Sequence, residues 1–355
     1  MNEYHMIREV REQSQAFSDI LRSRSRIAEI VHELAKKVPR SYYAVGCGSS
    51  YYAAMIGAFY HEYMFGLDSR AFPSSEFVWY APITNLPSPV VIALSRSGRT
   101  SETVEAARKA KKLKLSVIGL TSDLTSPLGQ ESEYSLDIGV KDEKSVIMTK
   151  SFTASTLVTI LIGYEFAKLQ GTVLKQFDSN LAQLPEDANK VIQTVDEQTK
   201  KTAETISKIS RFIYLGSGGN YPACLEGALK LRETSYTSSE AYHTLEVRHG
   251  PFAQLQKGIG VIAIVTEDQT IKQTETLLKQ IAATGATVIP ISNVPRVCDS
   301  YEQSIRMPES LAVEFTPILS MIPMQMLAYY YTLQHGVNPD VPRNLTRFVT
   351  TDIAS

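Results

Sequence analysis

Three charged residues in the segment PACLEGALKLRETSY, residues 222–236, have the types and spacing of an acid–base site. On a helix Glu226, Lys230 and Glu233 share one face, because they are four and three positions apart. A carboxylate can accept a proton from carbon while a nearby ammonium stabilises the negative charge that develops. The alternative is an ion-pair ladder on a solvated face, the usual role of this spacing. The apolar residues between the charges indicate a packed helix, which favours the site.

The segment SRSGRTSET, residues 95–103, follows the apolar run PVVIAL and is rich in hydroxyl groups. Free backbone N–H groups at the start of a helix bind anions, and arginines would add positive charge. A single hydroxyl would be enough for an ordinary helix cap. Because residues 95–101 hold four hydroxyls and a glycine, we expect a phosphate or similar anion to bind here. The candidate ligands are Ser95, Arg96, Ser97 and Thr100.

Three further segments are weaker candidates. Ser49 and Ser50 in GCGSS follow a predicted strand and could bind a ligand or cap the next helix. His249 stands before Gly-Pro and titrates near neutral pH, although alone it fits a loop histidine. The polar segment VPRNLTRFVT, residues 341–350, is expected to close over a site, and a frayed tail is the alternative. We expect no metal, because no HExxH or paired Cys/His pattern occurs.

The elements that carry these residues are repeated along the chain. SYYAVGCGSSYYAA begins at Ser41, and the similar RFIYLGSGGNYPAC begins at Arg211. At a nearly constant offset, PVVIALS is matched by IGVIAIV, and SVIGLTS is matched by TVIPISN. Short apolar runs followed by amphipathic stretches are typical of parallel strands with crossover helices. We therefore expect two flavodoxin-like α/β domains, each a three-layer αβα sandwich with a central parallel sheet.

The expected division of the chain has four parts. They are a helical lead-in at residues 1–35, a first domain at 36–178, a helical linker with the second domain at 179–335, and a tail at 336–355 that closes over the active site. Open α/β sheets bind ligands beyond the carboxyl ends of their strands. GCGSS and SRSGRTSET follow such strands, so they lie where a site is expected.

Composition excludes several classes of protein. The 355 residues carry 36 Lys and Arg against 37 Asp and Glu, so no overall positive field would hold nucleic acid or an acidic membrane. The three cysteines lack paired spacing and fit a reducing cytoplasm. The longest apolar runs are short or contain Gln325, which argues against a membrane span. We expect a cytoplasmic protein that acts on a small anionic molecule without a cofactor.

Taken together, these motifs resemble the two-domain sugar isomerase (SIS) family, including its glucosamine-6-phosphate synthase branch and its deaminase and deglycase relatives. The resemblance covers about residues 41–350 and rests on the order and spacing of six segments. They are GCGSSYYAA, SRSGRTSET, TKSFT, LEGALKLRETSY, EVRHGP and PRNL. This resemblance implies an enzyme that acts on phosphosugars and needs neither a metal nor a redox cofactor.

The resemblance also implies a role for each matching residue. Glu233 would move a proton between C1 and C2 of the sugar, and Lys230 would stabilise the enediolate. His249 would assist ring opening from the partner subunit, which makes the active unit at least a homodimer. The sugar 6-phosphate would be bound by Ser49, Ser50, Ser95, Arg96, Ser97 and Thr100.

Departures from the synthase pattern leave the reaction open. Arg347 stands where the synthase has a lysine near the sugar carbonyl, and arginine forms no Schiff base. Met148 replaces a serine before TKSF. The sequence begins at the SIS part, so we expect a reaction that does not use glutamine. Isomerisation, deamination and deglycation of a 6-phosphorylated sugar or aminosugar all fit.

Two other interpretations remain. A sugar with another C6 anion, such as a sulfonate, would fit a loop that Arg96 and Arg99 enrich in charge. A non-catalytic phosphosugar sensor would also have SIS domains. Against the sensor, Glu233, Lys230 and His249 are all present, and no helix-turn-helix precedes Ser41.

Overall fold

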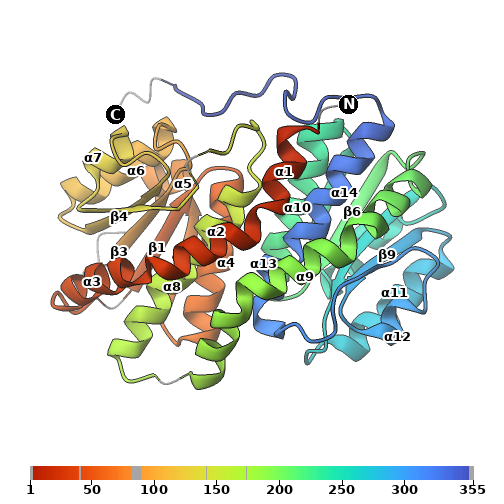
Figure 1. The fold of residues 1–355 in the computed structure, drawn as a ribbon, viewed down its shortest axis with the longest axis horizontal. Helices are drawn as coiled ribbons and strands as arrows, with labels where there is room; N and C mark the ends of the chain where they lie inside the picture. The colour runs from red at the N-terminus through yellow and green to blue at the C-terminus, as the bar shows by residue number, and fades with distance from the viewer. Residues whose placement is uncertain (1–2, 40, 82–88, 141, 173, 352–355) are drawn as a thin grey trace. The chain divides into compact units, whose positions relative to one another are not determined.

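The computed structural model describes residues 3–39, 41–81, 89–140, 142–172 and 174–351, which form two compact units (Figure 1). The first unit comprises Gln15–Glu143, Lys150–Ala182 and the tail from Leu345. The second unit comprises the chain up to Ser14, Lys144–Thr149 and Gln183–Asn344. These units differ from the four expected segments, because the N-terminal helices divide between them. Helix α1 (His5–Arg11) belongs to the second unit, and α3 (Arg24–Ala35) packs on α8 in the first.

A five-stranded parallel sheet of order β2-β1-β3-β4-β5 forms the centre of the first unit. Its strands are β1 (Ser41–Gly46), β2 (Asp68–Pro73), β3 (Val90–Leu94), β4 (Ser116–Thr121) and β5 (Tyr134–Asp137). Every residue of β1, β3 and β4 is buried, which explains why these strands are continuous apolar runs rather than alternating ones.

Helices cover both faces of this first sheet. On one face α5 (Ser74–Tyr80), α6 (Ser101–Lys112) and α7 (Pro127–Glu131) share a core with the strands, which includes Tyr43, Phe77 and Leu128. A second set consists of α4 (Ser49–Phe59), α8 (Lys150–Leu169) and α3, which pack on one another. Helix α8 is the one described helix that is long and apolar enough to cross a membrane. Its apolar window is 89% buried, so packing explains its composition.

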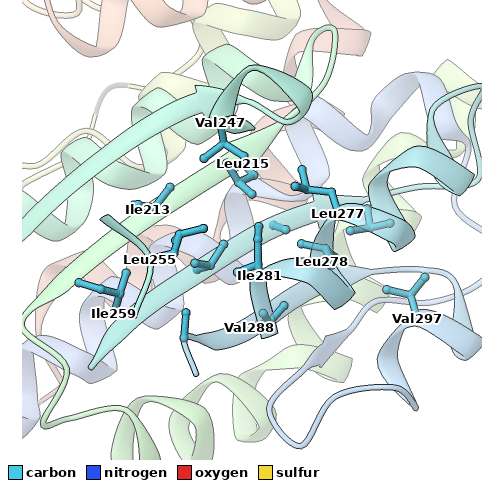
Figure 2. Packing of buried hydrophobic residues seen from close by; sticks show 14 of the residues in the cluster. Ile213, Leu215, Val247, Leu255, Ile259, Leu277, Leu278, Ile281, Val288 and Val297 are labelled. Atoms are coloured by element: carbon cyan, nitrogen blue, oxygen red, sulfur yellow. The ribbon is translucent and has the colours of Figure 1, made fainter. Parts of the chain in front are cut away.

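The second unit repeats the design. Its strands are β6 (Arg211–Gly216), β7 (Ser238–His243), β8 (Ile259–Val265), β9 (Thr287–Ser292) and β10 (Ile305–Arg306). The order β10-β9-β8-β6-β7 is the first sheet's order when each copy is counted from its own first strand. Figure 2 shows Leu215, Leu277 and Ile281 in the core between this sheet and α11 (Ile271–Ala283). Helix α12 (Pro295–Cys298) contributes Val297 to the same core. The predicted pair of flavodoxin-like αβα domains is confirmed.

The remaining helices complete the second unit. Helix α10 (Asn220–Ser235) packs against α14 (Met321–Gln334) and α13 (Thr316–Leu319). The stretch expected to be a helical linker, about residues 179–210, is helical as far as Thr205 in α9 (Lys175–Thr205). Helix α2 (Gln13–Arg22) follows α1.

Candidate active site

Helix α10 carries the three charges on one face, and they form a buried network. The Lys230 side chain is 0% exposed, and its Nζ lies 3.0 Å from Glu226 Oε1 and 2.7 Å from Glu233 Oε2. The Glu226 side chain is also 0% exposed, whereas that of Glu233 is 19% exposed. The charges therefore do not form a ladder on a solvated face. Glu233 is the carboxylate at the open end, where a substrate could reach it.

The network determines the charge of Lys230. Burial alone would lower the pKa of its ammonium, but the charges of Glu226 and Glu233 outweigh burial and raise that pKa. Lys230 is therefore a protonated cation, as a group that stabilises an oxyanion must be. The pair of Glu233 and Lys230 can serve as a base with an adjacent positive charge.

The anion loop, residues 95–100, lies in the first unit at the carboxyl end of β3. Ser95 Oγ donates to Thr100 Oγ1 at 3.2 Å, and Ser97 Oγ accepts the Arg99 N–H at 3.2 Å. Thr100 precedes α6 but makes no side-chain cap hydrogen bond. The hydroxyl groups of the loop therefore exceed what capping uses, which supports an anion site.

Gly98 is required for this loop conformation. Its φ is +64°, and a Cβ atom there would lie 1.9 Å from Ser126 Oγ. A hydrogen bond also holds the loop backbone, because Ser122 Oγ donates to the Arg96 carbonyl at 2.7 Å. The glycine and this hydrogen bond together determine the conformation of the loop backbone.

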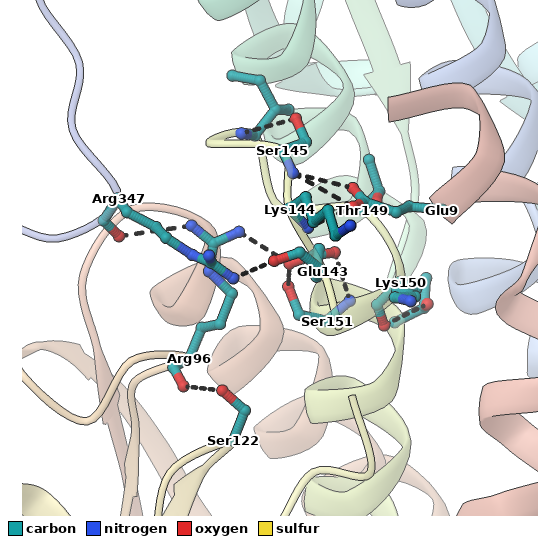
Figure 3. A network of polar contacts seen from close by, with 12 residues as sticks. Glu9, Arg96, Ser122, Glu143, Lys144, Ser145, Thr149, Lys150, Ser151 and Arg347 are labelled. Atoms are coloured by element: carbon teal, nitrogen blue, oxygen red, sulfur yellow. Dashed lines mark hydrogen bonds and ion pairs between the residues drawn. The ribbon is translucent and has the colours of Figure 1, made fainter. Parts of the chain in front are cut away.

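Arg96 has a carboxylate partner within the first unit. Its Nη1 lies 2.8 Å from Glu143 Oε2, and the side chains are 5% and 0% exposed (Figure 3). Glu143 also accepts hydrogen bonds from Ser151 N–H at 3.0 Å and from Ser151 Oγ. Burial would raise the pKa of Glu143, but the Arg96 charge and the Ser151 hydrogen bonds outweigh it, so the pKa is lowered. Glu143 had no sequence signal, because it lies in a polar segment without periodicity.

Arg99 has a carboxylate partner too, since its Nη2 lies 2.8 Å from Asp123 Oδ2. Both loop arginines are thus matched by negative charges.

Ser49 and Ser50 lie at the start of α4, beyond the carboxyl end of β1, and both are buried. A Cβ at Gly46 would lie 2.6 Å from the Ser50 carbonyl carbon, so glycine permits this close turn. Strand β1 pairs with β3, which leads into the anion loop. The order β2-β1-β3 makes this pair the switch point of the sheet, where open α/β sheets bind ligands.

The tail contacts the anion loop within the first unit. Val349 O accepts the Ser101 N–H at 3.3 Å, and the Thr351 N–H donates to Ser101 Oγ at 3.0 Å. Arg347 donates to the Glu143 carbonyl, and its own carbonyl accepts from Arg96 at 3.4 Å. Residues 345–351 are therefore anchored rather than frayed. Residues 352–355 of the expected tail lie outside the described residues.

His249 follows the short helix Leu245–Arg248 and is exposed. Its backbone N–H donates to the Glu246 carbonyl at 2.9 Å. In the described part of the second unit its side chain makes no hydrogen bond or ion pair with the α10 network. The structure therefore brings Lys230 and Glu233 together but not His249. Among the described residues no group of three His, Cys, Asp or Glu could hold a metal ion.

The two copies have diverged at their chemical positions. At the place in the second copy that matches the anion loop, Asp268 Oδ1 accepts the Thr270 N–H at 2.7 Å, just before α11 begins. In that copy a backbone N–H just before the helix is therefore bound by a carboxylate of the chain itself. In the first copy, the positions matching the α10 charges hold Ile56, Tyr60 and Tyr63. The anion loop is thus specific to the first unit and the charge network to the second.

Comparison with known proteins agrees with this duplication. The model of the SIS domain matches residues 37–162 and 205–333. The glutamine–fructose-6-phosphate aminotransferase (isomerizing) of Clostridium tetani is 31% identical over 364 residues, which cover 99% of this chain and 59% of that protein. The chain thus spans less than two thirds of that relative.

Two solved structures are similar over nearly their whole length. The C-terminal domain of glucosamine-fructose-6-phosphate aminotransferase from Francisella tularensis has a TM-score of 0.85 at 24% identity, covering 96% of this chain and 99% of that one. Glucosamine-6-phosphate deaminase from Thermotoga maritima has a TM-score of 0.76 at 28% identity, covering 97% and 99%.

Proposed function

The chain belongs to the SIS domain family, and on that premise we propose that it is an enzyme acting on a 6-phosphorylated sugar or aminosugar. The proposed step moves a proton between C1 and C2 through an enediol, or through an enolamine where nitrogen is present. The observation that carries the proposal is the ion pair of the buried Lys230 with Glu233, whose side chain is partly exposed. Isomerisation, deamination and deglycation share this step, and none of them uses glutamine.

Each part of the chemistry has a group to perform it. Glu233 accepts the proton from carbon, and the Lys230 ammonium stabilises the enediolate oxygen. The hydroxyls of Ser95, Ser97 and Thr100, with the N–H groups at the start of α6, bind the phosphate. Arg96 shapes the loop through Glu143. Arg347 takes the position of the synthase lysine, so no Schiff base forms there.

The proposal includes a quaternary arrangement and a location. The enzyme is a cytoplasmic homodimer or higher homo-oligomer, in which His249 of one subunit assists ring opening in the site of another. The exposure of His249 supports this, because an imidazole that its own α10 network does not engage is available to a partner. The substrate is a small anionic sugar.

A substrate panel tests the function. The protein is incubated with sugar phosphates, aminosugar phosphates, sugar–amino acid phosphates and a C6 sulfonate sugar, while ketose, ammonia and free amine are measured. Turnover of a phosphorylated member, lost in Glu233→Gln, is the expected result. Phosphosugar binding without turnover of any member would favour the sensor. Turnover of the sulfonate sugar alone would move the substrate class away from phosphate.

A further inference from the structure

His61 is a buried titratable residue of the first unit that the proposed chemistry does not use. It lies in a single π-helical turn, Tyr60–Met64, which directly follows α4, and such turns are frequent at functional positions. We propose that His61 is an acid-sensitive lock, which holds α4, α8 and β2 together while its imidazole is neutral and releases them when the imidazole is protonated. The inference goes beyond the proposed function and does not depend on it.

Both ring nitrogens of His61 contact other elements of the unit. Nε2 lies 2.8 Å from the Thr159 carbonyl oxygen of α8, and Nδ1 lies 3.3 Å from Ser69 Oγ of β2. Because a carbonyl can only accept, the hydrogen bonds assign the proton to Nε2, and the bare Nδ1 accepts from the Ser69 hydroxyl. The neutral imidazole thus links α8 and β2 to the end of α4.

The surrounding elements pack closely on the imidazole. A Cβ atom at Gly163 of α8 would lie 2.1 Å from His61 Cδ2, so glycine leaves the space that the ring fills. On the sheet, Tyr42 of β1 pairs with Ser69, and its ring centroid lies 6.0 Å from that of the imidazole. The imidazole is 0% exposed, so no solvent stabilises a positive charge on it.

The charges near this turn do not replace the missing solvent. The described titratable or charged residues on the turn and on α4, α8, β2 and β1 are Tyr42, Tyr43, Tyr51, Tyr52, Tyr60, Glu62, Tyr63, Asp68, Arg70, Lys150, Tyr164, Glu165 and Lys168. Glu62 and Asp68 are exposed to solvent. Glu165 is paired with Arg24 at 2.7 Å. Among these described residues, a protonated His61 would therefore have no carboxylate partner, and a buried cation without one is costly.

The direction of the pH effect follows from this burial. Burial lowers the pKa of His61 to about 4, and the hydrogen bond to the Thr159 carbonyl opposes the shift only in part. In an unfolded chain the pKa of histidine is about 6.5. Below that pH the unfolded chain binds a proton that the folded unit does not, so the stability due to neutral His61 is complete above about pH 6.5 and is lost as pH falls toward 4.

Urea unfolding followed by tryptophan fluorescence tests the lock, because Trp79 of α5 is the chain's one tryptophan and reports on the first unit. From pH 7 to pH 4.5 the folding equilibrium constant should fall by about 10²-fold more in the wild type than in His61→Gln, which keeps a neutral donor but cannot be protonated. His32→Gln is the matched control, since His32 is an exposed histidine of the same unit, and it should follow the wild type. Equal pH dependence of the wild type and His61→Gln overturns the proposal.

Nitrogen-15 NMR of the histidine rings in the wild-type protein is a second readout, which needs no substitution and no substrate. The His61 ring should stay in the neutral form with the proton on Nε2 at pH 5 while the unit is folded. A His61 ring that binds a proton near pH 6.5 in the folded protein overturns the proposal. If His61→Gln does not fold, His61→Phe, which keeps a ring and cannot be protonated, replaces it in urea. If neither variant folds, the wild-type ring titration alone decides.

Discussion

At the scale of single residues, Glu233 is the group on which the proposed chemistry depends. Glu233→Gln keeps the shape of the side chain but removes the base, so kcat should fall by about 10²–10⁴. The affinity for inorganic phosphate, measured by calorimetry, should stay within a few-fold, because the anion loop is untouched. Glu240→Gln, a half-exposed carboxylate of the same unit, is the control and should retain activity. A near-normal kcat in Glu233→Gln would reject the assignment.

Ser97 tests whether the loop binds an anion or merely holds its own shape. Ser97→Ala removes one hydrogen bond to a charged group, worth about 1.5–3 kcal/mol. That corresponds to a ~10- to 150-fold loss in kcat/KM for the phosphorylated sugar, at about 1.4 kcal/mol per decade. The loss should be nearly absent for the unphosphorylated sugar.

Equal losses of kcat/KM for both sugars would mean that Ser97 maintains the shape of the loop and does not bind the phosphate. Ser97 Oγ accepts the Arg99 N–H, so the variant would then act through the turn and not through the phosphate. Competition by inorganic phosphate against the substrate checks the same site in the wild type.

At the scale of elements, the buried pair of Arg96 and Glu143 joins the loop after β3 to the segment that precedes α8. Glu143→Gln leaves the Arg96 cation without its counter-charge, and losing one partner of a buried pair costs about 3–5 kcal/mol. The free energy of unfolding in urea should fall by that amount. The double variant Arg96→Met with Glu143→Met should recover much of the loss, since an apolar pair leaves no buried charge.

The pH dependence of stability identifies the same pair. The folded-state pKa of Glu143 is lowered, so its contribution is complete above the ordinary glutamate pKa of about 4.3 and is lost as pH falls through the folded value. Wild-type stability should therefore decrease more steeply below about pH 4.3 than that of Glu143→Gln. Parallel curves for the two proteins would mean that Glu143 is not held ionised by Arg96.

Sequence patterns predicted the helices and strands better than they predicted the contacts between side chains. The strands were predictable because central parallel strands are buried on both faces, and the amphipathic stretches after them form the expected crossover helices, such as Ile271–Ala283. The spacing of the α10 charges predicted a shared face but not its burial. The partner of Arg96 lies 47 residues away, and such a choice is made by tertiary packing, which no local period records.

At the scale of the whole molecule, the duplication divides the chemistry between two similar folds. Each unit has the same strand order, yet the anion loop occurs in the first and the α10 charges in the second. The fold needs neither feature, because each copy does without the feature of the other. The features that distinguish the copies are therefore the ones assigned to function, which is an internal control that a single domain would not provide.

His249 extends this division to a second subunit, and subunit mixing tests it. His249→Ala and Glu233→Gln should each be inactive alone, because each homodimer lacks one group in both sites. After full exchange of an equimolar mixture, half of the dimers are hybrids with one intact site, so activity should return to about a quarter of wild type. Mixing Glu233→Gln with the double variant Glu233→Gln/His249→Ala creates no intact site and should stay inactive. Exchange is verified by mass spectrometry of the intact dimers. If the mixture of His249→Ala with Glu233→Gln stays inactive after full exchange, His249 and Glu233 belong to the site of the same subunit.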